Sequence, residues 1–531
     1  MQSPGAPAPR ILVADPIAED GVRRLRESAE VELVQRLSED ELVERIAPFA
    51  ALVVRSETKV TSRVIQAGVN LRVIGRAGVG VDNIDLDAAT ANGVLVVNAP
   101  TGNTVAAAEH TLALMLALCR NVAVGDSSLR AGRWDRSKLV GSELRGKTLG
   151  VVGLGKIGAE VARLALAFQM RVIAFDPLLA ADRAAQLGVQ LGTLEAVLAG
   201  ADILTLHTPL NDATRGLIGA RELQLMPEGA RVINVGRGGL VDEDALAAAV
   251  ASGHLAGAAI DVFVKEPLAP GHPFLADPRI LITPHLGAST VEAQVSVATD
   301  VAEQIVDVLA GRPARWAVNA PRVAQEEAQV VVPYQDLAMR MGSLWAQLGG
   351  GAVRQVELIY RGDVARVQSA AITAEALGGM LSHFSQERVT AVNAGEVARQ
   401  HGIVVQEQRS SEAGSFAGAL LLRVQGDGPR EIEGTVVLGE PRVMRLDGLR
   451  MNLVPTGSFL MLYHKDRPSL IGEIGQLLGR ANVNIAEMQV VRDAPRGRAV
   501  TAVRVDDSVA PELAAELRLV EGVESLFQVE L

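Results

Sequence analysis

The stretch Leu149–Gly158, with the sequence LGVVGLGKIG, decides the fold of the middle of this chain. Its apolar start is typical of a buried strand, and its end opens a helical pattern. Between them, Gly153, Gly155 and Gly158 form a G-x-G-x-x-G turn, which lets the pyrophosphate of a dinucleotide approach the backbone at a helix N-terminus. Glycine-rich turns are common, so the motif gains its weight from the strand before it and the helix after it.

A carboxylate stands where a dinucleotide site of this kind requires one. Asp176 ends the next strand-like run, about 20 residues beyond the glycines. Its oxygens can accept hydrogen bonds from the adenosine ribose hydroxyls, and its charge would repel a 2′-phosphate. The sequence therefore predicts a site for NAD and not for NADP. The alternative is a structural strand-to-helix turn followed by an exposed aspartate.

Strands and helices alternate on both sides of this turn, which predicts parallel α/β sheets. Short apolar runs of the kind buried on both faces of a sheet occur at Leu149–Val152, Arg171–Phe175, Ile203–Leu206, Arg231–Val235 and Ala258–Val262. Earlier runs occur at Arg10–Ala14, Val31–Val34, Ala51–Val54 and Val73–Gly75. A helix from about Ser289 to Leu309 leads to a Gly- and Pro-containing junction at Gly311–Pro321.

Two further units follow this junction. Residues 322–452 have the pattern of a separate mixed α/β unit with few motif residues. Ser458–Leu531 has the order strand, helix, strand, strand, helix, strand, which predicts a ferredoxin-like arrangement.

Size and composition limit the classes of protein that fit. At 531 residues the chain is too long for one core, so we expect three or four domains. A net charge of −11 argues against a nucleic-acid partner, and the single Cys119 excludes intramolecular disulfides and a cysteine-based metal site. The start, Met1–Arg10, lacks the apolar segment of a signal peptide, and no uncharged apolar stretch approaches the roughly 20 residues of a membrane span. We expect a cytoplasmic protein that needs no metal.

Three motifs in the central part carry side chains suited to oxidising an alcohol. They are NVGRGGLVDE with Arg237, DVFVKEPL with Glu266 and TPHLGAST with His285. Each follows a predicted strand, at the edge where ligands bind in open α/β sheets. A histidine oriented by a carboxylate is a suitable base, and an arginine fits the carboxylate of a 2-oxo acid. Each residue alone has a structural explanation, whereas together they predict a catalytic site.

These motifs, with GLGKIG and HTPL–NDATRGLI, resemble the D-2-hydroxyacid dehydrogenase family. RAGVGVDNID and TGNTVAAAEHT are similar to the members that oxidise D-3-phosphoglycerate in the pathway to L-serine. The resemblance covers nearly the whole chain, because the tail fits a long form with an intervening domain and a C-terminal ACT domain. It implies a Rossmann-type NAD-binding domain, 104–289, inserted in a flavodoxin-like substrate domain, 1–103 and 290–320. The intervening domain would span 321–455 and the ACT domain 456–531.

The resemblance also implies roles for individual residues. His285 would be the acid/base, Glu266 its partner and Arg237 the cation that polarises the substrate. Cofactor contacts would come from Val79, Gly153, Gly155, Lys156, Ile157, Gly158, Asp176, Thr208, Val235, Gly236, Asp261, Leu286, Gly287 and Ala288. Substrate contacts would come from Arg55, Arg76, Gly78, Asn103 and Arg136, the last reaching a neighbouring subunit of a homodimer or homotetramer. Gly236 departs from the alanine that the family often has, which we expect to loosen the loop of Arg237.

The C-terminal unit resembles the family's ACT domain through YHKDRPSLIGEIGQLL and RANVNIAEMQ. The resemblance implies an L-serine effector site at a subunit interface, with His464, Asp466 and Asn484. Position 466 is often Asn in relatives, and an ACT pair that only dimerises is the alternative.

Two other functions stay open at this point. The substrate could be another D-2-hydroxy acid such as glycerate, lactate or 2-hydroxyglutarate. A non-catalytic, NAD-sensing binding protein could also retain all three catalytic side chains. The predicted phosphate-binding arginines and the sensor-like tail favour the phosphorylated substrate over both.

Overall fold

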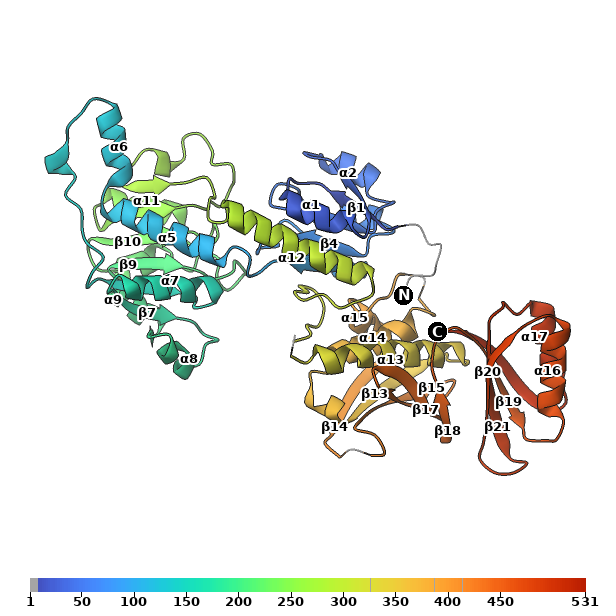
Figure 1. Ribbon diagram of the computed structural model, residues 1–531. Coiled ribbons are helices and arrows are strands. Elements are labelled where there is room, and N and C mark those ends of the chain that lie inside the picture. Colours follow the sequence, from blue (N-terminus) through green and yellow to red (C-terminus); the bar gives the residue numbers. More distant parts are fainter. Residues whose placement is uncertain (1–7, 325, 386, 413) are drawn as a thin grey trace.

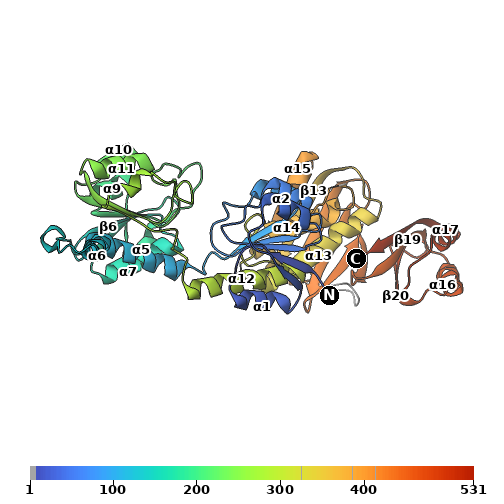
Figure 2. The same ribbon diagram turned by 90° about the horizontal axis from the view of Figure 1, so that it is seen from above.

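Four β-sheets follow one another along the chain in a computed structural model that describes residues 8–531 except 325, 386 and 413. Residues 1–7, which start the predicted first domain and make up most of the Met1–Arg10 segment, lie outside the described residues. The central and C-terminal sheets lie at opposite ends of the molecule (Figure 2). Parallel α/β sheets, a mixed sheet and an antiparallel sheet confirm the predicted fold class.

The first sheet has five parallel strands in the order β2-β1-β3-β4-β5, which is the flavodoxin-like order. Its strands are β1 (Arg10–Val13), β2 (Glu30–Leu33), β3 (Ala51–Val54), β4 (Val73–Arg76) and β5 (Leu95–Asn98), and its helices are α1 (Glu19–Arg26), α2 (Glu39–Arg45), α3 (Ser62–Ala67) and α4 (Leu86–Ala91). The long helix α12 (Val291–Leu309) returns to this sheet and packs on α1 and β4. Val297, Val301 and Ile305 of α12 are buried in its core, so sequence on both sides of the central sheet builds this N-terminal domain.

The central sheet has seven parallel strands in the order β12-β11-β10-β9-β6-β7-β8. These are β6 (Thr148–Val152), β7 (Arg171–Phe175), β8 (Gln190–Leu191), β9 (Ile203–Leu206), β10 (Ala230–Asn234), β11 (Leu255–Ile260) and β12 (Ile280–Ile282). One face is covered by α5 (Thr104–Cys119), α7 (Lys156–Ala167) and α8 (Ala181–Gln186), and the other by α9 (Leu194–Gly200), α10 (Ala220–Leu225) and α11 (Glu243–Ala251). Helix α6 (Val122–Arg130) projects from this central domain (Figure 1).

Some short elements were not identified from the sequence. Strand β8 has two residues, which is too short to show a periodic pattern. Strand β5 was also missed, and β11 begins at Leu255, three residues before the predicted run. In the described part of the chain no single helix is long and apolar enough to cross a membrane. The helices α5 and α6, taken together as one bent pair, have the length and the composition of a membrane span, and only these two properties suggest one.

The intervening domain has a mixed sheet in the order β14-β13-β15-β16-β17-β18, with β13 and β14 parallel and the other pairs antiparallel. Its elements are α13 (Ala328–Gln347), β13 (Val353–Gly362), α14 (Ala370–Leu381), α15 (Ala394–Gln400), β14 (Val404–Ser410), β15 (Gly418–Gly426), β16 (Glu431–Val437), β17 (Glu440–Leu446) and β18 (Leu449–Leu453). Helices α13 and α14 cross closely because each has a glycine against the backbone of the other helix. A Cβ added to Gly342 would stand 2.1 Å from Ala376 O, and one added to Gly379 would stand 2.0 Å from Met339 O.

A loop of the intervening domain, Arg388–Asn393, contacts the N-terminal domain. Arg388 donates to the carbonyl oxygen of Leu71, Thr390 to that of Gly93 at 3.2 Å, and the Asn393 side chain to that of Ala91 at 3.1 Å. These three side chains satisfy carbonyl groups at and near the ends of α3 and α4, and so dock one domain on the other.

The C-terminal domain has an antiparallel sheet in the order β20-β21-β19-β22, which is the ferredoxin-like order. Its elements are β19 (Ser458–Lys465), α16 (Leu470–Arg480), β20 (Ile485–Arg492), β21 (Arg498–Val505), α17 (Pro511–Arg518) and β22 (Val523–Glu530). The two helices cover one face, where Leu470, Ile474 and Leu517 are buried.

Candidate active site

The glycine turn between β6 and α7 is built so that no side chain could replace its first and last glycines. Gly153 has a φ of +90°, and a Cβ there would stand 2.7 Å from Thr208 Cγ2. A Cβ on Gly158 would stand 2.0 Å from Gly153 O. Gly155 has open space around it, at the N-terminus of α7. The turn therefore offers a bare backbone and a helix N-terminus to an anionic ligand, and fits a dinucleotide pyrophosphate.

Asp176 lies beside this turn at the end of β7. Its carboxylate accepts from the backbone amides of Leu154 at 2.8 Å and Leu178 at 2.9 Å. These bonds fix an anion next to the glycines, in the position where it can bind ribose hydroxyls and repel a 2′-phosphate.

Most of the other predicted cofactor residues share one edge of the central sheet. They follow the carboxyl ends of β9, β10, β11 and β12, and are Thr208, Val235, Gly236, Asp261, Leu286, Gly287 and Ala288. Thr208 Oγ1 is buried without a partner in the described part of the chain, so it has hydrogen-bonding capacity left for a ligand. Val79 lies across the gap in the N-terminal domain, where its carbonyl accepts from Asn98 at 2.6 Å.

Lys156, which follows Gly155, turns away from the glycine turn in this structure. Its ammonium lies 4.3 Å from the centre of the Trp316 ring. The guanidinium carbon of Arg322 lies 4.0 Å from the centre of the same ring. Burial and the neighbouring Arg322 lower the pKa of Lys156. A contact with a cofactor would require Lys156 to leave this ring. Its neighbour Ile157 packs against the core of the central domain.

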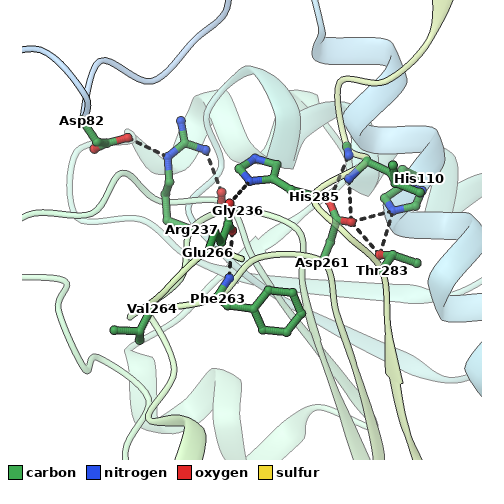
Figure 3. A network of polar contacts seen from close by, with 12 residues as sticks. Asp82, His110, Gly236, Arg237, Asp261, Phe263, Val264, Glu266, Thr283 and His285 are labelled. Atoms are coloured by element: carbon green, nitrogen blue, oxygen red, sulfur yellow. Dashed lines mark hydrogen bonds and ion pairs between the residues drawn. The ribbon is translucent and has the colours of Figure 1, made fainter. Parts of the chain in front are cut away.

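The His285 and Glu266 side chains meet where two loops leave the sheet (Figure 3). His285 Nδ1 lies 2.8 Å from Glu266 Oε2, and Glu266 Oε1 accepts from the Phe263 amide at 3.0 Å. Partial burial alone would raise the pKa of Glu266, but the hydrogen bonds from His285 and Phe263 outweigh it and hold the pKa below its usual value. Glu266 is therefore an anion that orients the imidazole and leaves its Nε2 free for a substrate.

Arg237 extends from the loop after β10 toward the N-terminal domain. Its Nε donates to Asp82 at 3.1 Å and its Nη1 to Gly236 O at 2.7 Å. Gly236 does not leave the loop unsupported, because Asn234 accepts from the Gly236 amide at 3.1 Å and donates to Arg237 O at 2.9 Å. A Cβ at position 236 would stand 2.8 Å from Leu206 O, so this chain has no room there for alanine without a shift.

A second arginine lies close to Arg237 on the N-terminal side. The guanidinium of Arg76 covers Gly78, where a Cβ would stand 1.5 Å from Nη1. Burial, and then the like charges of Arg237 and Arg55, lower the pKa of Arg76 to about 10. Its Nε is buried without a partner among the described residues. A mostly buried guanidinium beside other arginines is suited to an anionic substrate.

Two predicted substrate residues differ in their placement. Asn103, at the start of α5, has a buried Oδ1 without a partner among the described residues. Arg136 is exposed in the 3-10 turn Arg136–Lys138 on the arm that follows α6, and is not brought to the other arginines within this chain.

The predicted effector residues are likewise not brought together within one chain. His464 is buried with its Nε2 2.7 Å from Thr501, and Asp466 accepts from Arg492 at 2.6 Å. Asn484, which donates to Asp506 at 2.6 Å, precedes β20 at the end of the sheet where Ile485 is paired with Val505. His464 is paired with Ala499, at the other end.

Sequence reasoning missed two residues that contact this site. Asp82 contacts Arg237 from 155 positions earlier in the chain, and His110 contacts Asp261 at 3.3 Å. A signal was present for both, since Asp82 lies in GVGVDNID and His110 is a polar residue in an apolar helix.

Two families match this chain. The family described as D-isomer specific 2-hydroxyacid dehydrogenase, NAD binding domain, matches residues 112–287. The family described as D-3-phosphoglycerate dehydrogenase intervening domain matches residues 330–447.

Whole-chain relatives and solved structures agree with these matches. The chain is 43% identical to D-3-phosphoglycerate dehydrogenase of Synechocystis sp. over 100% of this chain and 98% of that protein. It is 41% identical to D-3-phosphoglycerate dehydrogenase of Archaeoglobus fulgidus over 98% of this chain and 100% of that protein. The solved TT0316 protein of Thermus thermophilus covers 58% of this chain and 99% of its own, at 38% identity and a TM-score of 0.55.

The fold and the site define an NAD-binding, D-isomer specific 2-hydroxyacid dehydrogenase. Within that class the chain belongs to the D-3-phosphoglycerate dehydrogenase family, with the intervening domain included. NAD as the cofactor is thereby confirmed.

Proposed function

We propose that this chain oxidises the C2 hydroxyl of D-3-phosphoglycerate to give 3-phosphohydroxypyruvate, the first step of L-serine biosynthesis. One observation carries the proposal: the His285–Glu266 pair lies on the same sheet edge as the glycine turn, with Arg237 beside it (Figure 3), and Arg76 of the N-terminal domain lies close to Arg237. The full-length relatives that carry this name support the choice of substrate.

NAD, when bound, supplies the acceptor for the hydride that leaves C2. His285 takes the hydroxyl proton on Nε2, because Nδ1 faces Glu266. Glu266 then stabilises the imidazolium that forms. Arg237 binds the substrate carboxylate and polarises the developing carbonyl. Asp82 and Gly236 hold its Nε and Nη1, and its Nη2 has no hydrogen-bond partner among the described residues.

The phosphate group is assigned to the N-terminal domain. Arg76 supplies a cation that lies close to both Arg237 and Arg55, and its buried Nε has no partner in the described part of the chain. A glycerate or a lactate would bring no phosphate to these arginines, so the cluster favours a phosphorylated acid.

The oligomer and the effector belong to the same proposal. Val122, Leu129, Trp134 and Val140 are exposed on α6 and the arm that follows it, with Trp134 80% exposed, and this apolar face is suited to a second copy. Asp466 and Asn484 lie at opposite ends of one sheet, so an L-serine site that uses both needs two C-terminal domains.

We place the protein in the cytoplasm, and assign residues 104–289 as its NAD-binding domain within the borders predicted above.

The test is NADH formation from D-3-phosphoglycerate, D-glycerate and D-2-hydroxyglutarate, with and without L-serine. We expect a clear preference for the phosphorylated acid, and a fall in kcat of about 10³-fold in His285→Ala. His254→Ala is the control, because His254 lies in the turn before β11, at the opposite edge of the sheet. Equal rates with all three acids would overturn the choice of substrate, and no rate with any of them would favour an NAD-binding protein without catalysis.

A further inference from the structure

The backbone at His285 is held in a conformation that a residue with a side chain rarely adopts. His285 has a φ of +54°, and its amide donates to Asp261 O at 2.9 Å and Thr283 O at 3.1 Å. The left-handed region is disfavoured for residues with a Cβ, so the surroundings must hold the turn in place. The direction of the imidazole depends on this turn.

The Asp261 carboxylate binds the two residues that follow His285. Its Oδ1 accepts from the Leu286 amide at 2.8 Å and its Oδ2 from the Gly287 amide at 2.9 Å. Asp261 is 0% exposed, so these bonds are not in competition with water. Thr283 also donates its hydroxyl proton to Oδ1, at 2.5 Å. The carboxylate therefore closes the turn from Thr283 to Gly287.

His110 completes this network from a different element. Its Nε2 lies 3.3 Å from Asp261 Oδ1 and 3.4 Å from Thr283 Oγ1 (Figure 3). The carboxylate can only accept, and the Thr283 proton is already used, so His110 Nε2 carries the proton and donates. His110 is thus the side chain that ties α5 to the turn of His285.

The contact between His110 and Asp261 matters because His110 lies on helix α5. The helix begins at Thr104, directly after Asn103, where the chain leaves the N-terminal domain, and it packs on α7 and β11 of the central domain. The position of His110 is therefore set by the helix that joins the two domains between which the substrate is proposed to bind.

We propose that His110 is a positioning residue for the reaction. Through Asp261 it holds the left-handed turn of His285, and so aims the imidazole at Glu266 and at the substrate. This inference rests on the proposed function for its catalytic consequence, but its structural part can be measured separately.

Three variants of the full-length protein test the proposal. His110→Ala removes the donor, and His110→Gln keeps an N–H donor at similar reach. His254→Ala removes an imidazole whose Nε2 lies 3.0 Å from the Leu223 carbonyl oxygen, away from the turn of His285. In His110→Ala we expect kcat to fall by at least about tenfold, because the imidazole of His285 loses its fixed direction. His110→Gln should regain most of the rate, and His254→Ala should keep it.

Amide hydrogen exchange of residues 283–288, followed by mass spectrometry, separates the two proposals. In His110→Ala the amides of this segment should exchange at least about tenfold faster than in the unchanged chain or in His110→Gln. Unchanged exchange, or exchange raised equally in His254→Ala, overturns the positioning role even if the enzyme is active. If the unchanged chain oxidises none of the acids, the proposed function fails, whereas the exchange result still decides the role of His110.

Discussion

Arg237 Nε of the central domain lies 3.1 Å from Asp82 Oδ2 of the N-terminal domain. The carboxylate holds Nε, and the Gly236 carbonyl holds Nη1, so the fork of the guanidinium is oriented before a substrate arrives. Pre-oriented donors bind a carboxylate with less loss of side-chain entropy.

A lysine should not replace Arg237. Arg237→Lys keeps the charge but cannot bind Asp82, Gly236 and a substrate carboxylate together, so we expect kcat/KM for D-3-phosphoglycerate to fall by about 100-fold. Asp82→Asn should lower it only about two- to threefold, because this pair is partly exposed. Steady-state kinetics on both variants checks the prediction, and equal losses would contradict it.

Arg76 should discriminate between acids with and without a phosphate. Arg76→Gln removes a partly buried cation, so we expect the ratio of kcat/KM for D-3-phosphoglycerate to that for D-glycerate to fall by about 100-fold. Arg63→Gln is the control, since Arg63 is exposed and paired with Asp40 at 2.9 Å on the surface. An unchanged ratio in Arg76→Gln would remove Arg76 from the phosphate site.

Asp176 should decide between the two nicotinamide dinucleotides. In Asp176→Ala the anion beside the glycine turn is lost, so we expect the preference for NAD over NADP to fall by at least about tenfold. The measurement is kcat/KM for each dinucleotide, with the exposed Asp244→Ala as a control. A preference that survives the change would mean that other groups exclude the 2′-phosphate.

Asp261 should link stability to pH. Burial alone would raise its pKa, but the hydrogen bonds from His110, Thr283 and the Leu286 amide outweigh burial and lower the pKa. A lowered pKa contributes stability above the ordinary carboxyl value of about 3.9, and this contribution is lost as the pH falls through the folded-state value. Asp261→Asn should therefore lose about 2 kcal/mol at neutral pH, with a smaller difference from the unchanged chain below about pH 4.

Thermal melts from pH 7 down to pH 3 check this expectation, again with Asp244→Asn as a control. A difference in Tm that stays constant with pH would show that the carboxylate charge does not contribute.

The sheets could be predicted from the sequence because their strands are continuous apolar runs. The same runs indicate which residues follow strand ends, so the approach of Glu266 and His285 to one sheet edge also follows from the sequence. The roles of these residues stay predictions.

The contacts of Asp82 and His110 could not be predicted in this way. Asp82 comes from the other domain, and its distance to Arg237 depends on how the two domains face each other. His110 is one of several polar residues near the start of α5, and only the packing of that helix on β11 brings it to Asp261. The placement of Lys156 on Trp316 is a third case, because the ring comes from the segment after α12.

The chain passes between the N-terminal and central domains only twice, through the segments that lead into α5 and α12, while the loop Arg388–Asn393 fastens the intervening domain to the N-terminal side. The glycine turn thus belongs to the central domain. The arginines proposed to bind the phosphate, Arg55 and Arg76, belong to the N-terminal domain, to which the intervening and C-terminal domains are joined. The effector proposed above would bind at the opposite end of the molecule from the central domain, which carries His285 (Figure 2). We expect its influence to fall on how fast the central and N-terminal domains separate to let the product escape, and so on turnover, with the proton-transfer step itself left unaltered.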